Sequence, residues 1–409
     1  MDSAVLKLRI TGKAGAYQVS AQIEGKQGAD GDLGALPENL AQQLRPLQES
    51  ILNTTLRLPD LSSARAQPKA DLAFIYDKNS DPSISPPVRN VASNFAPNAD
   101  VKSIRDIGSQ LFNCVFQQEV YTLYREALES AHKTRTRLPI KLCVEVPELA
   151  YIPWETIYDT RGQFHLCCYG TTPFARTASM KDQELYIYKE TPIRILSMIS
   201  LPKSFVGTQH ELNTDAEQSA LEEALRPLVE ADQVRLCWTA AGTSKELTRR
   251  LIKGDKGNPW DVFLFIGHGV EGKIVLEEDS GTGYRFLSAD VLKGLLTDPM
   301  GTKLVILNSC RGAQIDKGDR FASTAETLIR GGGIAAVIAM QFDISDKMGT
   351  TFSPIFFEQL MLNVPVQQAM TLTRLQLQHL GFTEWISPVL YMQNKDGTVM
   401  PPRNDPIPR

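Results

Sequence analysis

Two short apolar runs in the second half of the chain each end on a side chain that can take part in catalysis. Residues 261–268 end on His268, and residues 304–310 end on Cys310. A thiol needs a base to become a thiolate near neutral pH, and an imidazole is the usual base. The pair therefore indicates nucleophilic catalysis, with Cys310 as the nucleophile and His268 as the general base.

Both runs are apolar without alternation, which is typical of strands buried on both faces of a parallel sheet. Such sheets bind ligands at the carboxyl ends of their strands, where these runs carry a His and a Cys. There the main-chain N–H groups of Gly269 and Cys310 can hold an oxyanion, and Arg311 favours a thiolate. The alternative interpretation is a small buried Cys and an ordinary loop His.

The elements that must position this pair are predicted in the second half of the chain, where strands alternate with helices. Strands are expected at 193–199, 234–238, 261–268, 304–308, 334–340 and 388–392. Helices are expected at 214–230 (with Thr214 as its cap), 244–253, 288–296, 323–330, 352–362 and 366–380. Residues 271–285 are expected to be a polar, glycine-rich excursion. The pattern predicts an α/β fold with a mostly parallel sheet.

The first half predicts a mixed α/β region without a reactive pair. A hairpin is expected at 4–10 and 16–23, and one helix over 101–132. The remaining expected elements are a helix at 36–57 and strands at 70–76, 140–146, 162–170 and 184–189. We divide the chain into a non-catalytic region at 1–185, a catalytic domain at 186–400 and a flexible tail at 401–409.

The composition argues against several other functions. The 409 residues carry 43 Lys and Arg against 47 Asp and Glu, a net charge of −4, which does not indicate nucleic-acid binding. No apolar run approaches the ~20 residues of a membrane span, and the N-terminus does not predict a secretory signal. The six cysteines form no CxxC pair, so we expect a reducing, cytoplasmic location. Without metal-ligand spacing or a phosphate loop, no metal or cofactor is expected.

The two apolar runs resemble sequence motifs of a known family. Phe265-Ile-Gly-His268-Gly269 and Leu307-Asn-Ser-Cys310-Arg-Gly312 resemble the His-Gly and Cys motifs of caspase-like cysteine peptidases. More specifically, roughly residues 100–400 resemble the CHAT domain, which is often found with TPR repeats, although no such array is present in this sequence. Further resemblances to that family are its Pro-Trp-Glu motif at 149–159, its Gly-rich turn and strand at 331–340, and its last helix and strand at 365–374 and 385–391.

The resemblance implies a caspase-like sheet flanked by helices, preceded by a diverged pseudo-caspase half. It implies an endopeptidase in which Cys310 attacks the scissile carbonyl and forms a thioester. His268 would act as base and acid, and the N–H groups of Gly269 and Cys310 would hold the oxyanion. It also implies a protein substrate and an activating protein or ligand, in a bacterial defence or cell-death pathway.

Specificity is predicted from the residues around the nucleophile. Related enzymes that cut after Lys or Arg often have an Asp two residues before the Cys, where this chain has the neutral Asn308. Asp343 can supply an acidic pocket floor instead, although a turn or helix-cap role is the alternative for it and for Asp346. Together with Arg311, these residues are the expected substrate contacts, and they favour a basic or medium-sized polar residue before the scissile bond. Trp154 is expected to pack the front half on the active half.

Two functions stay open from the sequence. The first is a peptidase that is held inactive until a partner or ligand moves its loops. The second is a catalytically silent scaffold or regulatory module, against which the presence of both candidate catalytic residues argues. A nucleotide-dependent switch is disfavoured because the phosphate loop is missing.

Overall fold

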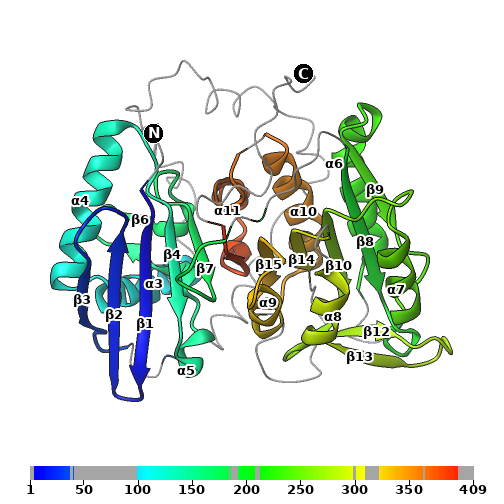
Figure 1. The fold of residues 1–409 in the computed structure, drawn as a ribbon, viewed down its shortest axis with the longest axis horizontal. Helices are drawn as coiled ribbons and strands as arrows, with labels where there is room; N and C mark the ends of the chain where they lie inside the picture. Colours follow the sequence, from blue (N-terminus) through cyan, green and yellow to red (C-terminus); the bar gives the residue numbers. More distant parts are fainter. Residues whose placement is uncertain are drawn as a thin grey trace.

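The computed structural model describes residues 4–36, 40, 99–183, 185, 192–207, 212–297, 301–308, 322–362 and 364–394. Within these ranges, eleven strands form one sheet in the order β3-β2-β1-β4-β7-β16-β15-β14-β10-β8-β9 (Figure 1). The elements predicted at 36–57, 70–76 and 184–189 and the tail at 401–409 lie almost wholly outside the described residues. The fold is therefore an α/β fold built on one large sheet, as the sequence predicts.

The right-hand part of the sheet is mostly parallel, which confirms the predicted strand pattern. Its parallel strands are β8 (Ile193–Ser200), β9 (Val234–Trp238), β10 (Val262–Gly267), β14 (Leu304–Asn308) and β15 (Ala336–Met340). The last strand, β16 (Pro388–Met392), runs antiparallel to β15. Because parallel strands end at one edge of the sheet, β8, β10, β14 and β15 share a carboxyl edge.

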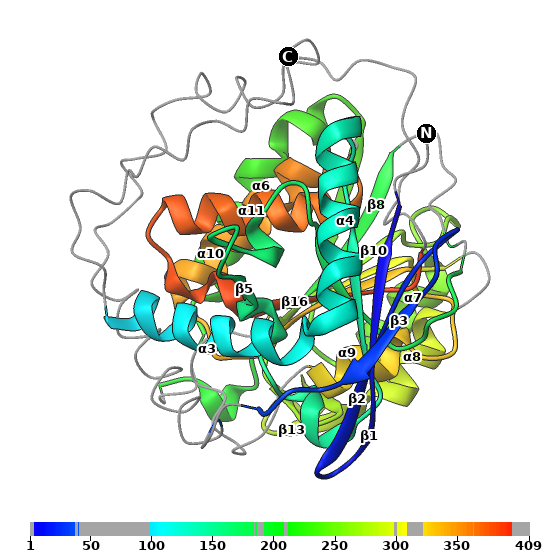
Figure 2. The same ribbon diagram turned by 90° about the vertical axis from the view of Figure 1, so that its left-hand side faces the viewer.

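Helices cover both faces of this part of the sheet (Figure 2). On one face lie α6 (Thr214–Glu230), α10 (Asp346–Leu360) and α11 (Val366–His379). On the other lie α7 (Ser244–Lys253), α8 (Ala289–Leu296) and α9 (Ala322–Ile329). Strand β10 contributes side chains to a separate apolar core on each face of the sheet, Leu264 to one and Phe265 to the other. This two-sided burial is why its sequence is apolar without alternation.

The left-hand part of the sheet contains the predicted hairpin. Strands β1 (Leu6–Lys13) and β2 (Ala16–Ile23) pair antiparallel, β3 (Ala29–Asp32) follows, and β4 (Ile140–Val144) runs parallel to β1. Helices α3 (Ala99–Val115) and α4 (Gln118–Thr134) cover one face. The strands alternate accordingly, since Leu6 and Leu8 enter the core whereas Lys7 lies on the opposite face.

The two parts are joined by strand pairing and by a hydrogen bond from a lysine that an ion pair holds in place. Strand β7 (Phe174–Thr177) is parallel to both β4 and β16. Strands from before and after residue 185 therefore belong to one continuous sheet. The carboxylate of Asp182 accepts hydrogen bonds from the Nζ atoms of Lys7 (2.6 Å) and buried Lys141 (2.7 Å). Lys141 also donates to the carbonyl of Asn394 near the end of the described chain. The division at 185 stays a prediction, within a continuous sheet.

Three local predictions are wrong. The helix expected over 101–132 is two helices, because the backbone of Gln117 is extended and that of Gln118 has a positive φ of 40°. The strand expected at 162–170 is only β6 (Phe164–His165), followed by a 3₁₀ turn. Thr214 does not cap α6, because Asn213 holds the cap position without a side-chain hydrogen bond.

The expected excursion at 271–285 also proves to be ordered β-structure. Strands β12 (Lys273–Glu277) and β13 (Tyr284–Ser288) form a hairpin, and β12 pairs on its other side with the short β11 (Gly269–Val270). The hairpin was missed because its connection is rich in Glu, Asp, Ser and Gly and hides a short alternating pattern.

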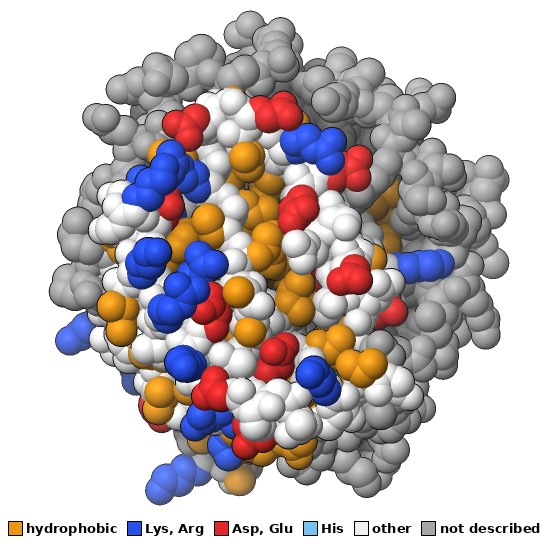
Figure 3. All heavy atoms as spheres, turned by 90° about the vertical axis from the view of Figure 1, so that its right-hand side faces the viewer, with side chains coloured by type: hydrophobic (Ala, Val, Ile, Leu, Met, Phe, Trp, Pro, Cys, Tyr) orange, Lys and Arg blue, Asp and Glu red, His pale blue; other side chains and the backbone are white. Residues whose placement is uncertain are grey.

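The sheet ends in an open edge at β9, on the side of the molecule shown in Figure 3. Hydrophobic side chains gather down the middle of this face, with most Lys and Arg side chains to one side. Among the described residues, no helix combines the length and the apolarity needed to cross a membrane.

Candidate active site

His268 follows β10 directly, at the carboxyl edge of the sheet. Its side chain is 0% exposed, and its ring packs edge-on against Phe205, with 4.9 Å between centroids and 90° between planes. Phe205 lies in a short 3₁₀ turn (Lys203–Phe205) just after β8, the neighbouring parallel strand. Two strand ends thus fix the position of the imidazole that the sequence predicts as the base.

The glycines on either side of His268 have different roles. A Cβ atom at Gly267 would lie 2.6 Å from the ring of Phe265 and 3.0 Å from the carbonyl oxygen of Ser200, so packing requires glycine there. After His268, the carbonyl of the histidine accepts a hydrogen bond from the N–H of Val275 (2.9 Å). Along a strand of an antiparallel pair, the main-chain N–H and C=O groups of one residue point toward the partner strand and those of the next point away. Because the carbonyl of His268 points toward β12, the N–H of Gly269, whose partner in register is Ile274, points away from β12. This is the orientation that an oxyanion donor needs.

Asn308 ends β14, the other strand of the predicted pair, and lies opposite Ile266 of β10. It is fully buried, and its Nδ2 donates a hydrogen bond of 2.7 Å to Oε2 of Glu217. Glu217 is 4% exposed and belongs to the first turn of α6. Its role was not predicted. The available signal was an acidic residue at the start of the helix after β8, because that helix begins near the carboxyl edge.

Cys310 and Arg311 lie outside the described residues, so their predicted roles stay predictions. The described part of β14 stops two residues before Cys310. Within the described ranges, no group of three His, Cys, Asp or Glu side chains is arranged to hold a metal ion.

Three buried thiols in the described ranges, those of Cys114, Cys143 and Cys168, are poor nucleophiles. Burial raises the pKa of Cys114 and of Cys143 to about 11. Burial, followed by the hydrogen bond with Cys167, also raises the pKa of Cys168 well above its ordinary value. At neutral pH these groups are almost entirely thiols, and the thiol is not the nucleophilic form.

Asp343 is half-buried in the connection between β15 and α10. It does not cap α10, because Ser345 occupies that position and accepts a hydrogen bond from the N–H of Met348 (3.1 Å). Buried Glu384 in turn accepts a hydrogen bond from the hydroxyl of Ser345 (2.9 Å). Asp346 is the first residue of the helix. The helix-cap alternative is therefore wrong for Asp343 and Asp346.

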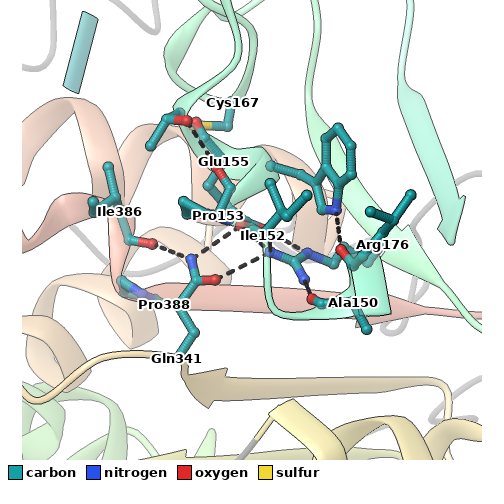
Figure 4. Close-up of polar contacts among 12 residues, drawn as sticks. Ala150, Ile152, Pro153, Glu155, Cys167, Arg176, Gln341, Ile386 and Pro388 are labelled. Atoms are coloured by element: carbon teal, nitrogen blue, oxygen red, sulfur yellow. Dashed lines mark hydrogen bonds and ion pairs between the residues drawn. The ribbon is translucent and has the colours of Figure 1, made fainter. Parts of the chain in front are cut away.

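The Pro-Trp-Glu segment places a buried charge beside the same edge (Figure 4). Trp154 is fully buried and donates its ring N–H to the carbonyl of Leu149 (3.0 Å). The next residue, Glu155, pairs with Arg176 of β7, whose Nε donates to Oε1 of Glu155 (3.0 Å). Both side chains are almost completely buried.

Gln341 connects this pair to the other part of the chain. It follows β15 directly, accepts a hydrogen bond from Nη2 of Arg176 (3.1 Å), and donates to Oε2 of Glu155 (3.0 Å) and to the carbonyl of Ile386 (2.7 Å). We call Glu155, Arg176 and Gln341 the junction cluster. The sequence predicts that Trp154 packs the two halves together, and the polar cluster beside it was not predicted. The signal for the cluster was a lone charge in each of two mostly apolar segments.

Comparison with known proteins gives one family. A model described as the CHAT domain matches residues 105–387. No curated protein matches the chain. Two crystal structures of a separase–securin complex from Saccharomyces cerevisiae are similar, each with a TM-score of 0.48, at 12% and 13% sequence identity. The likeness covers 95% of this chain but 30% of theirs, so this chain spans about a third of their length.

Proposed function

Because the chain belongs to the CHAT domain family, we propose that it is a cysteine endopeptidase with Cys310 as nucleophile and His268 as base. The observation that supports this most is the register of two strands. β10 and β14 are parallel neighbours in which Ile266 lies opposite Asn308. In the sequence, His268 and Cys310 each follow these opposed residues by two positions.

The dimensions of a sheet make this register informative. Neighbouring strands lie about 4.8 Å apart, and two residues of chain span at most about 7 Å. The chain that leads to the proposed nucleophile therefore leaves the sheet at the same edge as the proposed base, from the neighbouring strand. The high pKa values of the other buried thiols also favour Cys310 as the reactive cysteine.

In the proposed reaction, His268 accepts the proton of the Cys310 thiol, and the sulfur attacks the scissile carbonyl carbon. The N–H groups of Gly269 and Cys310 hold the resulting oxyanion. The C–N bond then breaks, His268 gives its proton to the leaving amine, and a thioester remains. Water, deprotonated by His268, cleaves the thioester and returns the thiol. We also propose Asn308, Asp343 and Arg311 as substrate contacts.

The burial of His268 supports a resting state that needs activation. With its side chain 0% exposed and Phe205 against its ring, the imidazole must become accessible before a substrate reaches it. We therefore propose activation by a protein or ligand. A scaffold in which the site never opens is the second candidate, and the same burial is the observation that favours it. The cytoplasmic location, the division at residue 185 and a role in bacterial defence or cell death are parts of the proposal that rest on the sequence and the family.

A thiol-reactive peptidyl probe tests the proposal, with the labelled residue mapped by mass spectrometry. We expect labelling at Cys310 that is abolished by Cys310→Ala and lost in His268→Ala. Cys237→Ala is the matched control, because it removes a half-buried thiol whose pKa burial raises, and it should leave labelling at Cys310 unchanged. If wild type stays unlabelled under every activating condition tried, the scaffold is the better interpretation.

A further inference from the structure

Glu217 and Asn308 form a buried acidic pair at the carboxyl edge, beside the proposed nucleophile. We propose that Glu217 selects a basic side chain, Lys or Arg, at the substrate residue before the scissile bond. The inference rests on the proposed peptidase function and adds its substrate class. It assigns the acidic floor of the specificity pocket to α6, rather than to Asp343.

The chemistry of the two side chains fixes how the amide of Asn308 is turned. A carboxylate only accepts hydrogen bonds, so Asn308 must present its NH₂ group to Glu217. Its Oδ1 then lies in the same amide plane, on the opposite side of the Cβ–Cγ bond from Nδ2. That oxygen is buried and has no hydrogen-bond partner. Glu217 thus holds an unpaired acceptor in a fixed orientation next to its own charge.

An unpaired buried acceptor destabilises the protein unless a ligand supplies a donor. An ammonium or guanidinium group supplies several donors together with a positive charge that the carboxylate attracts. A substrate carboxylate would instead meet the like charge of Glu217, and an aliphatic side chain would leave Oδ1 of Asn308 unsatisfied. The pair therefore favours a cationic side chain over an acidic or an apolar one.

The position of the pair indicates which substrate residue it contacts. Asn308 lies two residues before Cys310, within about 7 Å of chain. The substrate residue before the scissile bond carries the carbonyl that Cys310 attacks, so its side chain starts beside the nucleophile. A long side chain such as that of Lys or Arg can extend from there to the end of β14. Glu217 reaches the same place because the first turn of α6 lies at this edge.

Matched peptidyl acyloxymethyl ketone probes test the inference. They differ only in the residue before the reactive group, which is Arg, Lys, Gln or Asp, and the rate of labelling at Cys310 is measured for each. The readout is the ratio of the Arg rate to the Gln rate within one variant, which cancels any general effect on the nucleophile. Glu217→Gln removes the charge but keeps an acceptor for Asn308. Asp215→Asn is the matched control, because it removes an exposed charge from the same turn of α6.

We expect wild type to prefer the Arg and Lys probes. In Glu217→Gln the Arg-to-Gln ratio should fall roughly 10- to 100-fold, the range for losing a hydrogen bond to a charged group, whereas Asp215→Asn should keep it. Labelling at Cys310 without a basic preference, or with a preference that Glu217→Gln leaves intact, overturns the inference and leaves the peptidase standing. A preference that disappears in Asp343→Asn and not in Glu217→Gln assigns the pocket floor to Asp343. Absence of all labelling overturns the peptidase and this inference with it.

Discussion

Replacing Glu155 by Gln should weaken the whole fold, because Glu155 is the acidic member of the junction cluster. Glu155 is 1% exposed and its partner Arg176 is 3% exposed, so neither charge has water as an alternative partner. The substitution keeps the size of the side chain and removes its charge. Arg176 would keep its hydrogen bonds to the carbonyls of Ala150 (2.8 Å) and Ile152 (3.0 Å) but would lose its counter-charge.

The magnitude follows from the burial of the pair. Removing one partner of a buried ion pair lowers the free energy of unfolding by about 3–5 kcal/mol, because it leaves an uncompensated charge. The chain offers a matched control in the exposed pair of Arg9 and Glu145, whose side chains are 44% and 41% exposed. That pair has the same two-bond geometry, at 2.9 and 2.7 Å. Exposed pairs contribute about 0.2–1 kcal/mol, so Glu145→Gln should change stability by no more than that.

Equilibrium urea unfolding followed by tryptophan fluorescence measures the difference. With equal slopes, the shift in midpoint gives the change in free energy of unfolding for each variant. Combining Glu155→Gln with Arg176→Met removes the stranded charge and should restore part of the stability. Equal shifts for the Glu155 and Glu145 variants, or a loss below about 1 kcal/mol for Glu155→Gln, would refute the view that the junction depends on this buried charge.

Three further predictions follow from described contacts. Burial acts to raise the pKa of Asp182, but the hydrogen bonds from its two lysine partners outweigh it and lower the pKa below 3.8. Asp182→Asn removes the charge that accepts these hydrogen bonds, so it should reduce the free energy of unfolding at pH 7 by roughly 1.5–3 kcal/mol, the range for a hydrogen bond to a charged group. The difference from wild type should shrink as the pH falls below about 3.8, and urea titrations that find it unchanged at pH 3 would contradict the reasoning. Gly267→Ala should destabilise by about 1–3 kcal/mol because of the clash at β10. Gly294 lies in helix α8 with no atom near the added Cβ, so Gly294→Ala should stabilise the protein by about 0.5–1 kcal/mol. Thermal denaturation of the two variants measures the difference. Cys114 and Cys143 should resist iodoacetamide at pH 8 in the native protein and react after unfolding, as peptide mass mapping can show. Rapid native modification of either would mean that its thiol is less buried than the structure indicates.

The strands that carry the candidate site could be predicted almost to the residue. The expected strand at 304–308 has the same limits as β14, and the one expected at 261–268 is longer than β10 by one residue at each end. These strands are buried on both faces by helices, so the sequence is apolar throughout, and a polar residue marks each end. Local composition alone carries this information. The same holds for helix α6, whose limits of 214 and 230 match the predicted ones.

The polar contacts could not be predicted, because each joins residues that are far apart in the chain. Glu217 meets Asn308 across 91 positions, and Gln341 meets Glu155 across 186. Periodicity and motif spacing describe neighbours along the chain and contain no information about such pairs. The break between α3 and α4 was missed for another reason. It lies in the backbone of Gln117 and Gln118, and glutamine is a residue type that helices accept well.

The junction cluster bears on whether residues 186–400 could fold without the rest of the chain. Removing residues 1–185 would leave β16 as an unpaired edge strand, and such edges promote aggregation. It would also take Glu155 and Arg176 away from Gln341, which directly follows β15, the strand beside β14. The front half thus supports the carboxyl edge from which His268 and Asn308 extend. Residues 1–185 are then needed for the proposed chemistry, because they fix one end of the sheet edge on which it depends.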